Sequence, residues 1–148
     1  MIYYLVGQPH VGKTTLSKLL KNHLYPKNII QIDGDDIRDI FQNKDYSEEG
    51  RLKNIQRAQD IAKFLNSKGF DIIISLVSPY RELRNELKSS SDVIEVYIHT
   101  NDIRGRENFY VENYEQPTED YIDIDTTGVS EFTSLGELII KIDEYGNK

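Results

Sequence analysis

Short runs of apolar residues alternate along this chain with longer segments in which apolar residues recur every three or four positions. The runs are typical of buried strands, because a strand that is covered on both faces needs no polar alternation. They cover residues 2–6, 28–32, 70–76, 93–98 and 121–124. The longer segments are typical of amphipathic helices. We expect these helices around residues 16–24, over 47–67, from 79 to about 87, and from 134 to 142.

Polar residues at the ends of two segments support the expected helix boundaries. Ser47 can cap the long helix, where Glu48 and Glu49 suit the positive end of the helix dipole. Ser134 and Glu137 form a capping-box pattern before the closing helix.

Directly after the first strand, residues 7–14 read Gly-Gln-Pro-His-Val-Gly-Lys-Thr, a complete G-x-x-x-x-G-K-[ST] phosphate-binding loop. Gly7 and Gly12 let backbone N–H groups surround phosphate oxygens. Lys13 can bridge the outer phosphates, and the Thr14 hydroxyl can ligate Mg²⁺. Because a buried strand precedes the loop and helical periodicity follows it, the loop predicts that the chain binds a nucleoside triphosphate. The expected ATP-binding residues are Gly7, Gln8, Pro9, His10, Val11, Gly12, Lys13, Thr14 and Thr15.

The alternation of strands and helices around this loop predicts an α/β fold. We expect the three-layer α/β/α arrangement of P-loop nucleotide kinases, with a mostly parallel, five-stranded sheet and residues 1–148 in one domain. The stretch from residue 101 to 121, which is polar and aromatic, lacks a clear periodicity. In such sheets ligands bind at the carboxyl ends of the strands, so polar residues that follow a strand are the candidate site residues.

Composition narrows the function classes. The 148 residues carry 25 acidic and 18 basic side chains, a net charge of −7, which gives no general attraction to nucleic acid or an anionic membrane. The chain has no cysteine, which excludes disulfides, thiolate metal sites and a cysteine nucleophile. No signal-peptide pattern is found, and no apolar stretch approaches the roughly 18 residues that span a bilayer. We therefore expect a cytoplasmic protein whose partner is a small-molecule nucleotide rather than nucleic acid or a membrane.

Acidic residues follow the second expected strand, at Asp33, Asp35 and Asp36, with Arg38 about one turn further. Beside a phosphate loop, a carboxylate here could hold Mg²⁺ through water or accept the proton of an attacking hydroxyl. A solvated acidic turn that caps a short helix would have the same pattern. The neighbouring loop favours the interpretation as a site.

Two further polar groups could meet a second substrate. On the long helix, Arg51, Asn54 and Arg57 recur every three residues and form a polar stripe that could bind an anion, although such stripes are often only solvated surface. After the third strand, Ser78 precedes Pro79 and is expected to leave the strand with its hydroxyl free. The alternative is that Ser78 caps the helix that begins at Pro79.

Together these motifs resemble the adenylylsulfate kinase family, whose members transfer the γ-phosphoryl group of ATP to the 3′-hydroxyl of adenosine 5′-phosphosulfate. The resemblance runs from Tyr3 to about Thr126 and rests on four family motifs in order: a loop that ends in G-K-T-T, L-D-G-D-N-I-R, F-S followed by R-x-x-N-I-R-R, and I-S-P-Y-R. They match residues 7–15, 32–38, 46–57 and 77–81. Asp36 replaces the Asn, Tyr46 replaces the Phe, and Gln56 replaces the first arginine of the final pair.

The resemblance implies roles for individual residues. Asp33 and Asp35 would be the catalytic acids that activate the 3′-hydroxyl and organise Mg²⁺, with Lys13 as a further catalytic group and Thr14 beside Asp35 at the metal. The acceptor would be bound by Arg38, Tyr46, Arg51, Asn54 and Phe109. Ser78 matches a serine proposed in some members as a phosphorylated intermediate, a role that direct in-line transfer does not need. ATP and Mg²⁺ would be the cofactors, and a homodimer is expected from the family alone.

The chain departs from the family after the fourth strand. The family's K-G-L-Y segment is missing, and the loop between Asn108-Phe109, which matches N-F, and the Y-E-x-P piece is two residues short. Arg104 and Arg106 are the cations left there. A trimmed lid predicts weaker catalysis, a different acceptor, or a partner that completes the site. Three functions stay open: an adenylylsulfate kinase, a related kinase for another modified nucleotide such as cytidine diphosphoramidate, and a nucleotide-dependent switch.

Overall fold

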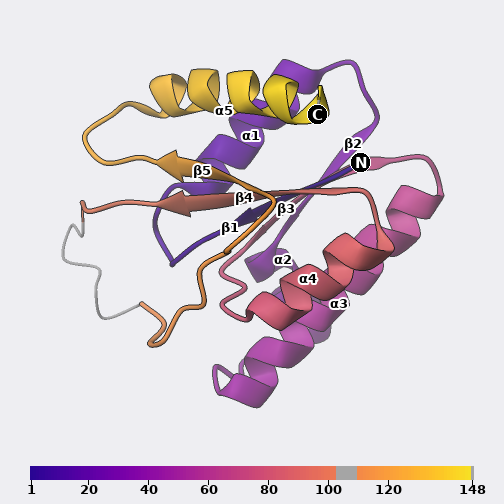
Figure 1. The fold of residues 1–148 in the computed structure, drawn as a ribbon. Coiled ribbons are helices and arrows are strands. Elements are labelled where there is room, and N and C mark those ends of the chain that lie inside the picture. The colour runs from indigo at the N-terminus through magenta and orange to yellow at the C-terminus, as the bar shows by residue number, and fades with distance from the viewer. Residues whose placement is uncertain (103–109, 148) are drawn as a thin grey trace.

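The computed structural model describes residues 1–102 and 110–147. At its centre is a five-stranded sheet with the order β2-β3-β1-β4-β5, in which every neighbouring pair of strands is parallel (Figure 1). The strands are β1 (Ile2–Val6), β2 (Ile29–Asp33), β3 (Asp71–Leu76), β4 (Val93–His99) and β5 (Tyr121–Asp125). The predicted α/β class and strand positions are confirmed, and the sheet is parallel throughout rather than mostly parallel.

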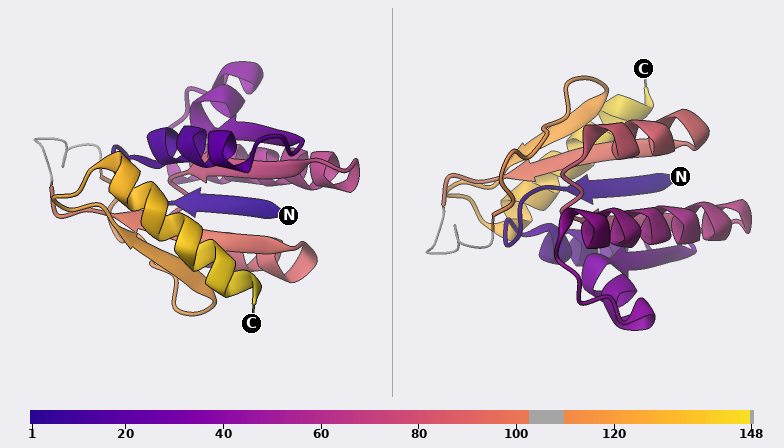
Figure 2. Two further views of the ribbon diagram at one scale, coloured as in Figure 1. Left: turned by 90° about the horizontal axis from the view of Figure 1, so that it is seen from above. Right: turned by 90° about the horizontal axis from the view of Figure 1, so that it is seen from below.

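Helices cover both faces of the sheet, which gives the three predicted layers (Figures 1 and 2). The helices are α1 (Lys13–Leu24), α2 (Gly34–Phe41), α3 (Glu48–Ser67), α4 (Arg81–Ser90) and α5 (Glu131–Gly146). On the face covered by α1 and α5, Leu16, Leu20 and Leu138 are buried in one core cluster. On the opposite face, Ile37 of α2 and Ala58 of α3 enter a second core cluster.

The central strand β1 is enclosed by both layers. Tyr4 and Val6 enter the core beneath α3 and α4, and Tyr3 and Leu5 enter the core beneath α1 and α5. None of these four side chains is more than 5% exposed. Burial on both faces explains why the strand is a continuous apolar run in the sequence.

Two predicted helix starts have different outcomes. Ser47 caps α3 as predicted, because its hydroxyl accepts a backbone N–H hydrogen bond at 3.4 Å. The closing helix is present, but its predicted start is wrong: α5 begins at Glu131, and its N-cap is Ser130, whose Oγ accepts from the Thr133 N–H at 3.2 Å. Ser134 lies inside the helix and is 2% exposed. The first turn of α5 faces solvent, so no apolar periodicity marks it.

The carboxyl ends of the strands meet at one edge of the sheet. After β1 the chain continues to β2 on one side of the sheet, whereas β4 and β5 lie on the other side. The loop between β1 and α1 therefore lies where the strand order reverses, which is the usual ligand site in such sheets.

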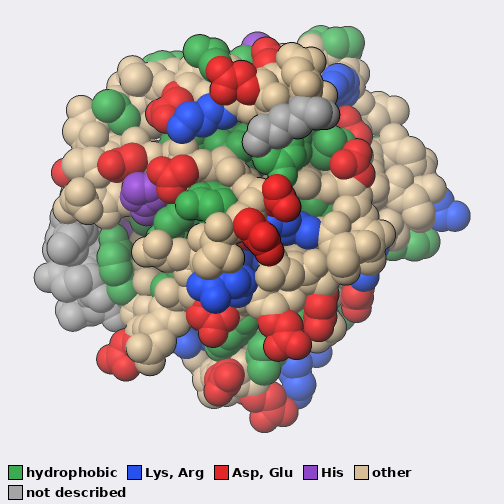
Figure 3. Space-filling model, viewed as in Figure 1, with side chains coloured by type: hydrophobic (Ala, Val, Ile, Leu, Met, Phe, Trp, Pro, Cys, Tyr) green, Lys and Arg blue, Asp and Glu red, His purple; other side chains and the backbone are tan. Residues whose placement is uncertain are grey.

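The surface adds little to the choice of site. On the face shown in Figure 3, acidic side chains are interspersed with basic ones. Within residues 1–102 and 110–147, no helix combines the length and apolarity needed to cross a membrane. The carboxyl edge of the sheet is thus the first place to look for function.

Candidate active site

The phosphate loop turns tightly between β1 and α1. A Cβ atom added to Gly7 would lie 2.2 Å from the carbonyl oxygen of Ile98 in β4, so only glycine fits. Gly12 has φ +100°, in the left-handed region that glycine favours, and it is the N-cap of α1. The loop therefore presents the N-terminus of α1, with its unpaired N–H groups, to the carboxyl edge of the sheet.

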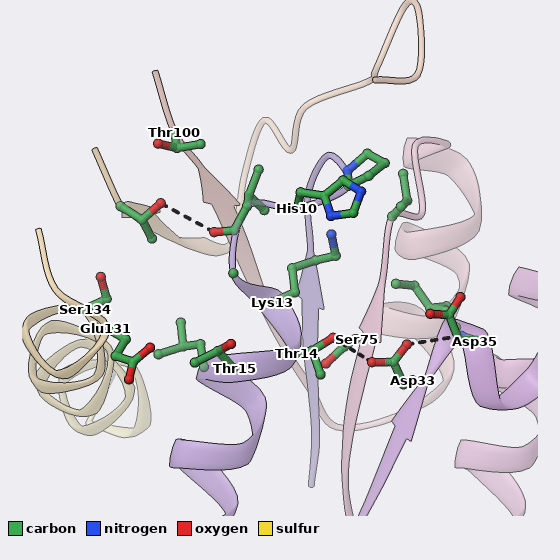
Figure 4. A pocket seen from close by; sticks show the side chains of 18 of the residues that line it. His10, Lys13, Thr14, Thr15, Asp33, Asp35, Ser75, Thr100, Glu131 and Ser134 are labelled. Atoms are coloured by element: carbon green, nitrogen blue, oxygen red, sulfur yellow. Dashed lines mark hydrogen bonds between the residues drawn. The ribbon is translucent and has the colours of Figure 1, made fainter. Parts of the chain in front are cut away.

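Lys13 is the first residue of α1, and its side chain is buried beneath the loop (Figure 4). Its Nζ donates a hydrogen bond to the Gln8 carbonyl oxygen at 2.6 Å. Burial lowers the pKa of Lys13 to about 8, against the opposing effect of the Asp33 and Asp35 carboxylates. A phosphate anion beside Nζ would favour the charged form and raise this pKa again.

We expect the binding of Mg·ATP to be accompanied by proton uptake at Lys13. With a pKa of about 8 before binding, about half a proton is taken up at pH 8 and almost none at pH 6. Because free Lys13 is neutral above pH 8, the affinity for ATP falls as the pH rises from there. Isothermal titration in buffers of different ionisation enthalpy measures the uptake. The proton uptake should disappear in Lys13→Met and persist in Lys18→Met, because Lys18 is exposed on α1. Equal uptake in the wild type and in both variants would contradict the prediction.

The acidic cluster begins α2 and faces the phosphate loop. Thr14 Oγ1 donates a hydrogen bond to Asp33 Oδ2 at 2.6 Å, and the Asp35 N–H donates to Asp33 Oδ1 at 3.1 Å (Figure 4). Asp33 also forms a capping box with Asp36, so the cluster both caps a short helix and lines a cavity with the loop. The Asp35 carboxylate is exposed at this cavity and accepts no hydrogen bond from the described part of the chain.

The oxygen groups around Thr14 fit a magnesium ion that is shared with phosphates. A hydroxyl that donates its proton to a carboxylate keeps its lone pairs for a cation, as Thr14 does beside Asp33. Ser75 pairs with Asp33 in the β2–β3 register and lines the same cavity, and its buried Oγ has no hydrogen-bond partner among the described residues. Those residues contain no cluster of three or more His, Cys, Asp or Glu that could hold a metal by itself. Phosphate oxygens would therefore have to complete the coordination.

The cavity above the loop has a volume of about 510 Å³, which suits a nucleotide. It extends from the acidic cluster to the start of α5, where Figure 4 shows Glu131 and Ser134 opposite Asp33. The residues at this far end were not identified from the sequence: Thr100, Thr126, Val129, Glu131 and Ser134. These residues follow β4 or β5 in the sequence, at the same edge of the sheet as the phosphate loop, and this position is the signal that could have identified them.

A second cavity, of about 280 Å³, adjoins the first. Four of the predicted acceptor residues line it: Arg38, Tyr46, Arg51 and Asn54. The walls common to both cavities are Pro9, His10, Gly34, Leu76 and Val77. The fifth predicted acceptor residue, Phe109, lies outside the described residues, as do Arg104, Arg106 and Asn108. We call this second cavity the acceptor cavity after the predicted residues that line it, and a ligand in it would adjoin one bound at the phosphate loop.

Arg38 shapes the mouth of the acceptor cavity. Its Nη1 donates to the carbonyl oxygens of Asn43 and Asp45 at 3.1 and 3.0 Å. Its guanidinium carbon lies 4.0 Å from the centre of the Tyr46 ring, which is 65% exposed. Arg38 therefore holds the loop before α3 and the Tyr46 ring in addition to contributing positive charge.

The predicted polar stripe of α3 is divided between two places. Arg51 and Asn54 line the acceptor cavity, whereas the Arg57 guanidinium lies 4.3 Å from the ring centre of Phe41 in α2. The side chain of Arg51 forms no hydrogen bond or ion pair with another described residue, so its charge is available to an anion. Asn54 Nδ2 donates to the Gly34 carbonyl at 3.3 Å, and its buried Oδ1 has no partner in the described chain.

Ser78 departs from both sequence-based expectations. Its hydroxyl is not free, because Oγ lies 2.7 Å from Tyr4 Oη and the residue is 1% exposed. It does not cap α4 either: Tyr80 is the N-cap, and the Tyr80 side chain forms no capping hydrogen bond. A φ of +44° at Ser78 accompanies the inward turn of the chain before Pro79. A catalytic role for Ser78 stays a prediction, and the bond to Tyr4 favours a positioning role.

A buried ion pair holds the loop that carries Ser78. Arg84 of α4 is 0% exposed; its Nε donates to Glu95 Oε2 at 2.6 Å, and its Nη1 donates to the Ser78 carbonyl at 2.6 Å. Its Nη2 donates to the Glu115 carbonyl. Lys88 Nζ donates to the other oxygen of Glu95 at 3.0 Å. Sequence patterns did not identify this pair, because Arg84 has the appearance of ordinary helix surface charge.

Comparisons of sequence relate the chain to known kinases. The model of the family described as adenylylsulphate kinase matches residues 1–131. Adenylyl-sulfate kinase of Pseudomonas aeruginosa is 34% identical over 105 residues, which cover 67% of this chain and 54% of that enzyme. Cytidine diphosphoramidate kinase of Campylobacter jejuni is 30% identical over 131 residues, which cover 84% of this chain and 77% of that enzyme. This chain thus spans about half the length of the Pseudomonas enzyme and most of the Campylobacter enzyme.

Solved structures share the fold. The APS kinase of Mycobacterium tuberculosis, determined in complex with AMPPNP and APS, superposes with a TM-score of 0.81 at 18% identity and covers 96% of each chain. Shikimate kinase of Aquifex aeolicus gives a TM-score of 0.66 at 17% identity, with 99% of this chain and 98% of that chain covered. At these identities the similarity supports the fold alone, which agrees with the three-layer architecture described above.

Proposed function

Because the chain belongs to the adenylylsulphate kinase family, as the match over residues 1–131 establishes, we propose that it transfers the γ-phosphoryl group of ATP to the 3′-hydroxyl of a nucleotide. Adenosine 5′-phosphosulfate is the first candidate for this acceptor. The observation that carries the proposal is the pair of adjoining cavities. One lies over the phosphate loop, and the other offers Arg51 to an anionic group.

In this mechanism the chain positions two substrates and moves one proton. The phosphate loop and Lys13 bind the triphosphate and neutralise charge that develops on the γ-phosphoryl group. Mg²⁺ bound at Thr14 would withdraw charge from the phosphate oxygens. Asp35 accepts the proton of the 3′-hydroxyl while that oxygen bonds to phosphorus and the bond to ADP breaks. Asp33 orients the Thr14 hydroxyl and caps α2, which fixes the position of Asp35.

Cytidine diphosphoramidate is a second candidate acceptor. The cytidine diphosphoramidate kinase of Campylobacter aligns with 84% of this chain, whereas the Pseudomonas adenylyl-sulfate kinase aligns with 67%. The absence of the K-G-L-Y segment also separates this sequence from the adenylylsulfate kinase pattern. Both candidates combine an anionic 5′ chain with a ribose, so Arg51 could bind either, and they differ in the base that would meet Tyr46.

The test is phosphoryl transfer from Mg·ATP to a panel of acceptors, followed by ADP release and product mass. The panel contains adenosine 5′-phosphosulfate, cytidine diphosphoramidate, and unmodified adenosine and cytidine 5′-diphosphates. Turnover with adenosine 5′-phosphosulfate would support the first candidate, and turnover with cytidine diphosphoramidate alone would support the second. Binding of ATP without transfer to any acceptor would contradict the kinase proposal and favour a nucleotide-dependent switch.

Arg51→Ala should raise the KM for the acceptor by roughly 10- to 100-fold, the scale of a lost charged hydrogen bond. The KM for ATP should stay within about twofold, because Arg51 does not line the nucleotide cavity. Arg57→Ala is the matched control, since it removes the same side chain from the same helix outside the acceptor cavity. Steady-state kinetics with each substrate varied in turn provide the measurement. A comparable rise in the KM for ATP in Arg51→Ala would show that the acceptor assignment is wrong.

A further inference from the structure

Residues 111–116, which we call the strap, begin at Val111, a residue that lines the acceptor cavity. Tyr114 Oη donates a hydrogen bond to the Val77 carbonyl at 2.5 Å. Burial raises the pKa of the Tyr114 phenol, so that it remains a donor at all ordinary pH values. The Glu115 N–H donates to the Pro79 carbonyl at 3.0 Å, and Glu115 Oε1 accepts from the Arg81 N–H at 2.8 Å. The C-terminal part of the strap is therefore fixed to the loop between β3 and α4.

The N-terminal end of the strap is held by the phosphate loop. Gln8 Nε2 donates to the Val111 carbonyl at 2.9 Å, and the Val111 N–H donates to Gln8 Oε1 at 2.7 Å. One side-chain amide thus pairs with both backbone groups of a residue 103 positions away. The opposite polarity of the two bonds fixes the orientation of the amide. Val111 lines the acceptor cavity beside Pro9 and His10, the two residues that follow Gln8.

Gln8 is also connected to the triphosphate site through its backbone. Its carbonyl oxygen accepts the hydrogen bond of Lys13 Nζ at 2.6 Å. The Lys13 ammonium has three N–H donors, so it can bind a phosphate oxygen of a triphosphate and keep its bond to the Gln8 carbonyl. A bound phosphate would thus fix Lys13, and through it the Gln8 backbone, and the Gln8 side chain carries that constraint to Val111.

We propose that Gln8 is a positioning residue that ties the strap to the phosphate loop and makes the triphosphate site and the acceptor wall interdependent. The assignment of the acceptor cavity rests on the proposed function, whereas the tie itself rests on the two bonds to Val111. Occupation of the loop by a triphosphate holds the strap against the cavity. By linkage, an acceptor that contacts the strap raises the affinity for the triphosphate by the same factor.

Amide hydrogen exchange of the strap tests this proposal without an acceptor. In the nucleotide-free protein, Gln8→Met should speed exchange at Val111 by about fivefold to 100-fold, the range for two lost hydrogen bonds. In the wild type, saturating Mg·AMPPNP should slow exchange of the strap further, and in Gln8→Met this effect of Mg·AMPPNP should vanish. Gln8→Glu keeps an oxygen that accepts from the Val111 N–H and loses the donor. Its exchange rate at Val111 should therefore lie between those of the wild type and Gln8→Met.

Asn66→Leu is the matched control. Asn66 Nδ2 makes a comparable bond to the Phe70 carbonyl at 2.8 Å, at the amino-terminal end of β3 and away from the site. It should leave exchange of the strap unchanged. Unchanged strap exchange in Gln8→Met, or an equal response to Mg·AMPPNP in both proteins, would overturn the proposal. Failure of Mg·AMPPNP to bind the wild type would instead contradict the kinase function, and faster exchange in nucleotide-free Gln8→Met would still support the tie.

With the acceptor found in the transfer assay, kinetics give a second readout. Gln8→Met should raise the KM for the acceptor by at least about fivefold. The Kd for Mg·AMPPNP, measured without acceptor, should change by a smaller factor. A merely structural role would lower thermal stability and leave the ratio of the two constants unchanged. Equal changes in the acceptor KM for Gln8→Met and Asn66→Leu would count against the tie.

Discussion

Asp35→Asn is expected to lower kcat by about 10²- to 10⁴-fold while the affinity for Mg·ATP stays within about threefold. The two carboxylates of the cluster have different surroundings. Both oxygens of Asp33 already accept hydrogen bonds, from Thr14 Oγ1 at 2.6 Å and from the Asp35 N–H at 3.1 Å. The Asp35 carboxylate is exposed in the nucleotide cavity and accepts none from the described residues, so it is the better proton acceptor. Asparagine has the shape of the aspartate side chain but cannot accept the proton of the 3′-hydroxyl.

Asp33→Asn should act differently. It weakens the acceptor of the Thr14 hydroxyl, so we expect a higher Mg²⁺ requirement together with a lower kcat. Single-turnover transfer at saturating acceptor, measured over a range of Mg²⁺ concentrations, separates the two variants. Asp36→Asn is the control, because Asp36 belongs to the same turn and its side chain accepts, among the described residues, only from the Asp33 N–H at 3.3 Å. If Asp35→Asn turns over nearly as fast as Asp36→Asn, Asp35 is not the general base.

Glu95→Ala is expected to lower the free energy of unfolding by about 3–5 kcal/mol, the usual cost of an uncompensated buried charge. Glu95 is 1% exposed, and its two oxygens accept from Arg84 at 2.6 Å and from Lys88 at 3.0 Å. Without Glu95, the fully buried Arg84 keeps its charge and loses its counter-ion. Typical domains have a free energy of unfolding of only about 5–15 kcal/mol, so this single change removes a large part of the stability.

Urea unfolding measures this loss, and the melting temperature should fall by about 6–20 °C. Glu137→Ala is the matched control: Glu137 pairs with Lys141 at 2.8 Å on the surface of α5, with side chains 41% and 36% exposed. Such an exposed pair is worth at most about 1 kcal/mol. The double variant Arg84→Met with Glu95→Ala should recover part of the stability, because it removes the orphaned charge. A loss in Glu95→Ala no larger than in Glu137→Ala would contradict the assigned role of the buried pair.

The elements of this fold were predictable because their signals are local. The apolar runs that became β1 and β3 and the helical stripe of α3 are repeated patterns within short segments. The phosphate loop was predictable for the same reason, since residues 7–14 are contiguous and their flanks identify them. The wrong start of the closing helix, with Ser134 in place of Ser130, lies one turn from the observed cap.

The division of labour among the polar side chains required the tertiary structure. Ser78 turns inward to Tyr4 although a free hydroxyl was expected, because the partner comes from a strand 74 residues away. Arg51 and Arg57 have the same spacing pattern, yet only Arg51 lines the acceptor cavity, since Arg57 meets Phe41 of another helix.

The sequence by itself determined that the chain is an α/β protein with a phosphate loop and a second polar group at the same edge of the sheet. Only the tertiary structure decided that Asp33 accepts from Thr14, and that Gln8 pairs with Val111, 103 residues away. A periodic pattern records which face of an element is buried, and this is settled within the element. A hydrogen bond between distant residues depends on how separate elements pack, and it leaves no repeat in the sequence from which it could be predicted.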